Sequence, residues 1–90
     1  MNILCSKLYE ERLKDILELL AKEDYRIAKE FKMYLDTIIL NMPSKINKYK
    51  KSVYFDDENI KDVEFRGCRI PFLIDKRKNS CVLLGITKKN

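Results

Sequence analysis

The chain has no histidine and no tryptophan in its 90 residues. Histidine is the side chain that most often acts as a general base near neutral pH, and it is the commonest metal ligand. Its absence excludes nucleophile systems built as Ser-His-Asp or Cys-His. Hydrolases of those classes are therefore excluded by composition alone.

Cysteine and glycine are scarce as well. The three cysteines, Cys5, Cys68 and Cys81, are far apart and form no Cys-x-x-Cys pair, so we expect no four-ligand zinc site, and their odd number does not suggest a disulfide framework. We expect them to be small buried hydrophobes in a reducing cell. The two glycines, Gly67 and Gly85, cannot form a glycine-rich phosphate loop. The sequence thus predicts no metal and no small-molecule cofactor.

Long hydrophobic runs are also missing. The longest unbroken apolar runs have about four residues, far short of the roughly 20 that a membrane helix needs. The first residues carry no basic segment followed by a long apolar one, so we expect no signal peptide and a cytoplasmic protein. With 46% hydrophobic and 37% charged residues, the chain fits one globular domain over residues 1–90.

The charge of the chain is unevenly distributed. The formal net charge is +5, but residues 1–43 carry seven Lys and Arg against eight Asp and Glu. Residues 59–90 carry eight Lys and Arg against three Asp and Glu, which is a net charge of +5. The positive excess therefore lies in the last third of the chain. Such asymmetry favours a polyanionic partner, either a nucleic acid or an acidic protein segment.

Two helical patterns occupy the first half of the chain. Apolar residues recur at helical spacing over residues 6–22, namely Tyr9, Leu13, Ile16, Leu17 and Leu20. A second stripe over residues 24–41 consists of Ile27, Ala28, Phe31, Tyr34, Leu35 and Ile38, with Met42 following. Ser6 and Asp24 can cap the two helix starts, and Pro43 ends the second helix. The very short link predicts an antiparallel helical hairpin.

The last third of the chain changes to a period of two, which is typical of strands. The alternating apolar residues are Val63, Phe65, Cys68, Ile70, Phe72 and Ile74. They are interrupted by a tight turn at residues 66–67. Residues 81–86 are apolar on both faces, which predicts a central strand. Because Pro71 has no N–H to donate, it should face an unpaired edge or a bulge.

These elements predict an α+β fold of order βααβββ, with a first strand at residues 3–5. The antiparallel helical hairpin should pack on one face of a small, mainly antiparallel sheet. Phe31 and Leu84 should belong to the core between them. The other face should carry Arg66, Arg69 and Lys61, near the C-terminal lysines. Residues 44–58 form a polar connection, which aromatic side chains at 49, 54 and 55 should hold against the body.

Three segments of the second half resemble the RelE/ParE superfamily, the toxins of bacterial type II toxin–antitoxin systems. They are residues 54–62 (YFDDENIKD), 67–75 (GCRIPFLID) and 82–88 (VLLGITK). The resemblance covers nearly the whole chain and is strongest over residues 59–89. It implies a compact βααβββ toxin held inactive by a cognate antitoxin, with roles in growth inhibition and plasmid stabilisation. The ParE-like branch inhibits DNA gyrase, whereas the RelE-like branch cleaves mRNA on the ribosome.

On the RelE-like alternative, the resemblance assigns catalytic roles to three basic residues. Lys61 would be the base, Arg69 the phosphate stabiliser and Lys88 an electrostatic helper, since RNA cleavage needs a proton acceptor and charge stabilisation. The chain departs from this pattern at three places. The second strand lysine is replaced by Val63 or Glu64, Lys88 stands where the family has an arginine and so lacks bidentate phosphate geometry, and the C-terminal tyrosine has no counterpart. These departures favour the ParE-like alternative, which needs no catalytic set.

Basic residues can also serve binding alone. The candidates for contacts with an antitoxin or a target are Arg66, Arg69, Lys76, Arg77 and Lys89. The expected partners are a cognate antitoxin and either DNA gyrase or the ribosome with its mRNA, and no membrane is expected. Two further alternatives are a nucleic-acid-binding module without toxic chemistry and a degenerate toxin that only binds its antitoxin.

Overall fold

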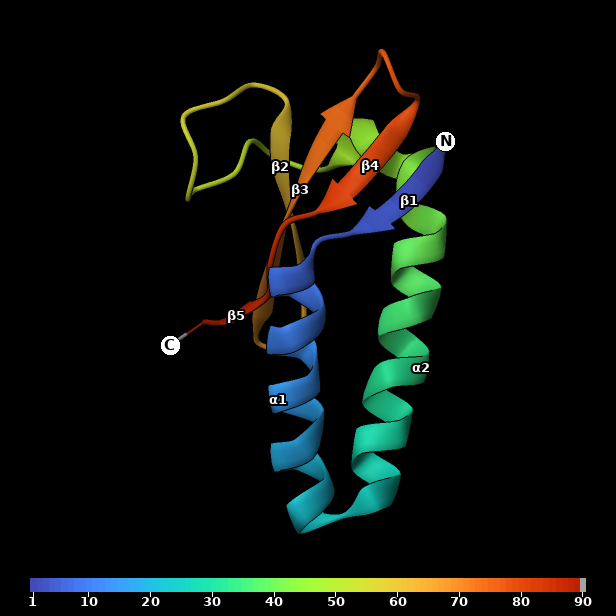
Figure 1. Ribbon diagram of the computed structural model, residues 1–90, viewed down its shortest axis with the longest axis vertical. Helices are drawn as coiled ribbons and strands as arrows, with labels where there is room; N and C mark the ends of the chain where they lie inside the picture. The colour runs from blue at the N-terminus through green and yellow to red at the C-terminus, as the bar shows by residue number, and fades with distance from the viewer. Residues whose placement is uncertain (90) are drawn as a thin grey trace.

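The computed structural model describes residues 1–89 and confirms the α+β fold with the order βααβββ (Figure 1). The elements are β1 (Asn2–Cys5), α1 (Lys7–Glu23), α2 (Tyr25–Asn41), the 3-10 helix η1 (Met42–Lys48), β2 (Ile60–Phe65), β3 (Cys68–Asp75), β4 (Ser80–Leu83) and β5 (Thr87–Lys88). The sequence pattern predicts neither η1 nor the short β5. Both are too short to carry a detectable period.

Side-chain caps set the starts of both long helices, as predicted. The Ser6 hydroxyl accepts the N–H of Tyr9 at 3.0 Å and donates to the carbonyl of Leu84 at 2.9 Å. It therefore also fastens the start of α1 to the chain after β4. Asp24 alone separates the helices and accepts the N–H of Arg26 at 2.9 Å. Within residues 1–89, no helix is both long enough and apolar enough to cross a membrane.

The main sheet has the strand order β1-β4-β3-β2, and β5 pairs with β3 beyond the end of β4. Strands β2, β3 and β4 form the predicted antiparallel meander, and β4 is central, as its apolar faces indicate. Strand β1 pairs with β4 in parallel. A four-residue edge strand has no pattern that could predict its neighbour or its direction.

Pro71 lies where β3 changes partners. Residues Phe72 to Asp75 pair with β4, whereas Cys68 and Arg69 pair with β5. The carbonyl of Pro71 accepts the N–H of Leu84 at 2.9 Å across the gap between these ladders. Since N–H and C=O of one strand residue point to the same side, the missing N–H of proline also faces this gap, which agrees with the sequence prediction.

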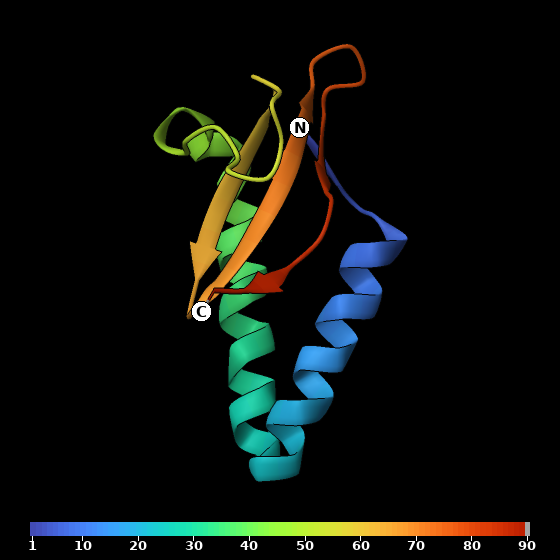
Figure 2. The same cartoon turned by 90° about the vertical axis from the view of Figure 1, so that its left-hand side faces the viewer.

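The helical hairpin covers one face of the sheet, as expected, and its far end extends beyond the strands (Figure 2). The largest fully buried side chains are Phe72, Leu35, Met42, Ile70, Leu83 and Ile86. Phe31 of α2 meets Phe65 of β2 edge to face, with ring centroids 5.1 Å apart. Tyr49 packs in the same way on Phe72 at 5.5 Å, so the connection is held to the body.

Two sequence predictions about burial are wrong. Leu84 is only partly buried, because it follows the last residue of β4. Cys5 is exposed on the edge strand, whereas Cys68 and Cys81 are buried as expected. Apolar character alone does not tell which face of a strand a residue occupies when the strand's end is unknown.

We predict that Phe31→Ala destabilises the fold by about 3–5 kcal/mol, because it removes a buried ring and leaves a cavity. Phe31 is 6% exposed, whereas Leu40 on the same helix is 73% exposed. Leu40→Ala is therefore the matched control and should change the free energy of unfolding by less than about 0.5 kcal/mol. Urea denaturation of both variants measures this difference, and equal midpoints would contradict the core assignment.

Candidate functional site

The outer face of the sheet, opposite the helices, carries a polar cluster around Arg69. Arg69 and Glu64 are directly opposite each other on β3 and β2. The Arg69 guanidinium donates to Glu64 at 2.7 Å, and its Nε lies 3.8 Å from the Asp62 carboxylate. Lys89 donates to the second oxygen of Glu64 at 2.7 Å. Two cations and two carboxylates thus neutralise one another at this place.

The connection before β2 closes this cluster from one side. The N–H of Val53 donates to Asp62 at 2.9 Å, and the Tyr54 hydroxyl is 2.7 Å from the Thr87 hydroxyl of β5. The Tyr54 ring centroid lies 5.9 Å from the Arg69 guanidinium. The side chain of Asp62 is 9% exposed, and its Oδ1 atom has no hydrogen-bond partner among the described residues. We call Arg69, Asp62, Glu64, Tyr54 and Lys89 the Arg69 cluster.

The electrostatics of the Arg69 cluster follow from these contacts. Hydrogen bonds from Lys89 and then Arg69 lower the pKa of Glu64 to about 2. The bond to Glu64 in turn raises the pKa of Arg69. Glu64 is therefore ionised at physiological pH, and its carboxylate is bound to the Arg69 guanidinium. A phosphate that approached Arg69 would meet the negative charges of Glu64 and Asp62 beside it.

Lys61 does not share a face with Arg69, so this sequence prediction is wrong. Lys61 is directly opposite Phe72, and its ammonium donates to the carbonyl of Ile46 in η1 at 3.0 Å. Side chains of a strand alternate between faces, and Lys61 has the parity of buried Val63. Lys61 therefore lies on the helix side of the sheet, and the strand separates it from Arg69.

The other predicted basic residues are also dispersed. Lys88 is opposite buried Cys68, one residue out of step with Arg69. The guanidinium of Arg66 lies over the Tyr34 ring of α2 at 4.8 Å, so it turns toward the helices rather than toward the outer face. Lys76 and Arg77 lie in the turn at the opposite end of β3 from Arg69. Strand β3 has eight residues and rises roughly 3.3 Å per residue, so its two ends are far apart.

The sequence interpretation considered Glu64 as a replacement for the strand lysine, but it did not predict that Glu64 and Asp62 pair with Arg69. A usable signal exists, because a two-residue turn at Arg66 and Gly67 fixes the pairing of the flanking strands. Counting outward from that turn places Glu64 opposite Arg69, as observed. No comparable signal predicts that Tyr54 reaches Thr87, since a long connection separates these residues.

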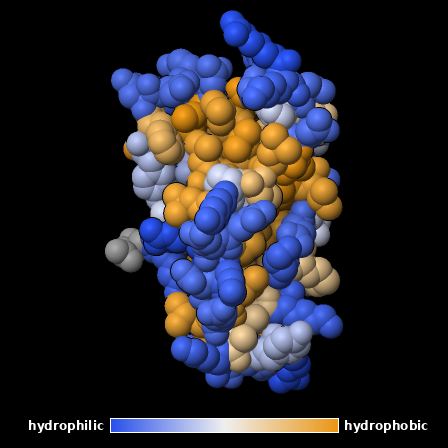
Figure 3. Space-filling view, viewed as in Figure 1, coloured by the Kyte–Doolittle hydropathy of each residue, from blue (hydrophilic) through white to orange (hydrophobic). Residues whose placement is uncertain are grey.

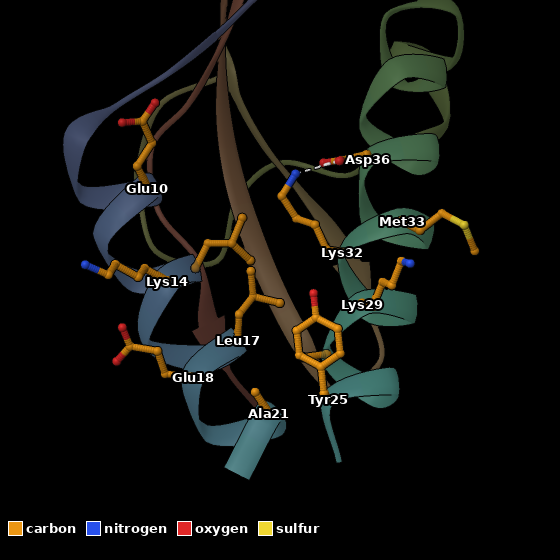
Figure 4. A pocket seen from close by; sticks show the side chains of 12 residues that line it. Glu10, Lys14, Leu17, Glu18, Ala21, Tyr25, Lys29, Lys32, Met33 and Asp36 are labelled. Atoms are coloured by element: carbon orange, nitrogen blue, oxygen red, sulfur yellow. Dashed lines mark hydrogen bonds and ion pairs between the residues drawn. The ribbon is translucent and has the colours of Figure 1, made fainter. Parts of the chain in front are cut away.

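A second candidate site is a groove between α1 and α2, with a volume of about 770 Å³ (Figure 4). Its floor is apolar and includes Leu13, Leu17, Ala21 and Ala28, and the ring of Tyr25 stands between the two helices. Met33 also lines the groove, but its side chain points away from α1. Charged side chains of both signs line the rim, namely Glu10, Lys14, Glu18, Lys29, Lys32 and Asp36. Within residues 1–89, no three cysteine or carboxylate side chains come together in an arrangement that could hold a metal ion.

The fold is similar to a solved structure, the solution structure of conserved hypothetical protein HP0892 from Helicobacter pylori. The TM-score is 0.63 at 17% sequence identity, and the match covers 98% of this chain and 93% of that chain. At this identity the likeness shows a shared fold. The sequence itself matches no protein-family model and no curated protein.

We predict that the pKa of Glu64 rises from about 2 toward its ordinary value of about 4.5 in the variant Lys89→Gln, because the largest cause of the depression is removed. A group with a depressed pKa contributes stability that is lost as the pH falls through the folded-state value. The contribution of Glu64 should therefore persist at pH 4 and disappear near pH 2. NMR titration of the carboxyl carbon measures this shift. Lys78→Gln is the control and should leave Glu64 unchanged.

Proposed function

We propose that this chain is the toxin of a type II toxin–antitoxin system and that it acts on DNA gyrase without being a nuclease. The βααβββ order supports this proposal, together with the RelE/ParE-like sequence segments at residues 54–62, 67–75 and 82–88. The fold is shared with a structure over 98% of the chain, so the likeness includes both the hairpin and the sheet.

The contact between Arg69 and Glu64 favours DNA gyrase over mRNA as the target in this proposal. Cleavage of RNA needs cations that face the phosphate and a base close to them. Here Arg69 is engaged by Glu64 at 2.7 Å, and Lys61 lies on the other face of the sheet. A lysine acts as a base when neighbouring cations lower its pKa, and Lys61 instead donates to a backbone carbonyl. These contacts favour inhibition by binding over cleavage.

The groove between α1 and α2 is the surface that fits a protein target. Its apolar floor and mixed-charge rim are typical of a protein contact, whereas a phosphate backbone requires a basic surface. The rim carries three basic and three acidic side chains, so its charges balance. We therefore assign the groove to the target protein in this proposal.

Brief induction of the chain in cells, followed by pulse labelling, tests the target. Thymidine incorporation should fall first, within minutes, and amino-acid incorporation should follow later. An early collapse of amino-acid incorporation with intact DNA synthesis would instead support the RelE-like alternative. Unimpaired growth at full expression of folded protein would contradict toxicity itself and leave the degenerate-toxin alternative.

Four variants separate the groove from the basic residues. Lys61→Gln and Arg69→Gln should remain toxic, because no catalytic set is required. Tyr25→Glu should reduce growth inhibition at least about tenfold, since it replaces an aromatic ring between the helices with a charge. Tyr25 is 71% exposed, so the fold should tolerate the change. Leu40→Glu on the same helix lies outside the groove and should remain toxic. Loss of toxicity in both glutamine variants, with circular dichroism unchanged, would refute the binding mechanism.

A further inference from the structure

A row of apolar side chains crosses the outer face of the sheet. The strand register aligns Leu4 of β1 with Val82 of β4, Val82 with Leu73 of β3, and Leu73 with Ile60 of β2. Directly paired residues of neighbouring strands share a face, so these four side chains form one continuous row. We call Leu4, Val82, Leu73 and Ile60 the outer apolar row. None of the four belongs to the core between the sheet and the helices.

The outer apolar row is partly open to solvent. Leu4 is 49% exposed, Val82 and Leu73 are half-buried, and Ile60 is buried. Figure 3 shows hydrophobic residues gathered over the upper part of the molecule, where β1 and β4 lie in front, with hydrophilic residues above and below them. Large apolar residues that share one exposed sheet face are typical of an interaction site.

Cations border this row at one end. Lys76, Arg77 and Lys78 form the β3–β4 turn, and none of the three forms an ion pair among residues 1–89. Lys76 and Arg77 line a hollow of about 380 Å³ that Leu73 of the outer apolar row also lines. Asp75 is the one carboxylate of the hollow, and it accepts the N–H of Lys78 at 3.2 Å. The hollow therefore keeps a positive charge next to an apolar surface.

We infer that the outer apolar row and the β3–β4 turn bind a segment of a partner protein that carries large apolar side chains followed by carboxylates. The apolar side chains would cover Val82, Leu73 and Leu4. A carboxylate would enter the hollow between Lys76 and Arg77, where it forms charge-assisted hydrogen bonds. The rim of the inter-helix groove has equal numbers of basic and acidic side chains, so it favours neither an acidic nor a basic partner. The cations of the β3–β4 turn attract an acidic segment.

This inference rests on the proposed function for the partner, which is the neutralising protein of the same system. It assigns that protein to the outer face of the sheet, whereas the target is assigned to the groove. In Figure 1 the strands that carry the row lie in the upper part of the molecule and the helical hairpin extends below them, so the two surfaces lie at different places. The acidic segment of the neutralising protein would therefore bind outside the groove and leave it uncovered.

The test is binding of the proposed neutralising protein to the full-length chain, measured by biolayer interferometry. Val82→Glu should raise the Kd at least about tenfold, because it places a carboxylate in the apolar row. Lys76→Glu combined with Arg77→Glu should raise the Kd to a similar extent and weaken its dependence on salt. Tyr25→Glu and Lys29→Glu in the groove are the matched controls and should leave the Kd within about twofold.

Methyl NMR of the unmodified chain provides a second readout that does not depend on the folding of a variant. Addition of the partner should shift the methyl signals of Leu4, Leu73 and Val82 and leave those of Ala21 and Met33 in place. Shifts confined to the groove, or an unchanged Kd for the outer-face variants, would overturn the inference and leave the proposed function standing. Absence of any binding would contradict both, since a neutralising partner is required by each.

Discussion

The two-residue turn between β2 and β3 is the constraint on which the rest of this structure depends. Arg66 and Gly67 both have positive φ, 45° and 78°, as hairpin turns of this length require. Gly67 adopts this conformation without steric cost, and Arg66 is held in it by stacking on the Tyr34 ring at 4.8 Å. With the turn in place, the register of six residue pairs is determined, and with it the face of every charged residue on both strands.

The register of β2 and β3 places Arg69 and Lys61 on opposite faces of the sheet. It brings Arg69 against Glu64 and close to Asp62, and it sends Lys61 to the helix side. A shift of one residue would reverse both assignments and bring Lys61 onto the outer face. Arg69 is therefore paired with carboxylates and Lys61 with a backbone carbonyl, so the two do not form a common phosphate-binding group. Three further cations, Lys76, Arg77 and Lys78, lie at the β3–β4 turn without an ion pair among residues 1–89, and there they border an apolar surface.

The two uncovered apolar surfaces follow from the size of the domain. A sheet of four short strands with β5 cannot cover two helices of 17 residues each, so the far part of the hairpin and one sheet face stay open. A small domain buries a limited share of its apolar surface, and exposed patches then become contact surfaces. The groove has a neutral rim, and the outer apolar row has a positive end. This difference in charge is why we assign them to different partners.

Local patterns determined the elements of this protein. The helical stripes, the caps at Ser6 and Asp24, and the alternation after residue 60 predict the helices, the meander and the central strand, because each depends on neighbours within a few residues. Only the tertiary structure decided that β1 pairs with β4 in parallel, that Tyr54 reaches Thr87, and that the predicted basic residues lie in separate places. Those outcomes depend on strand register and on contacts between distant segments. Periodicity carries no information about either, since a slip of one residue preserves the pattern and exchanges the faces.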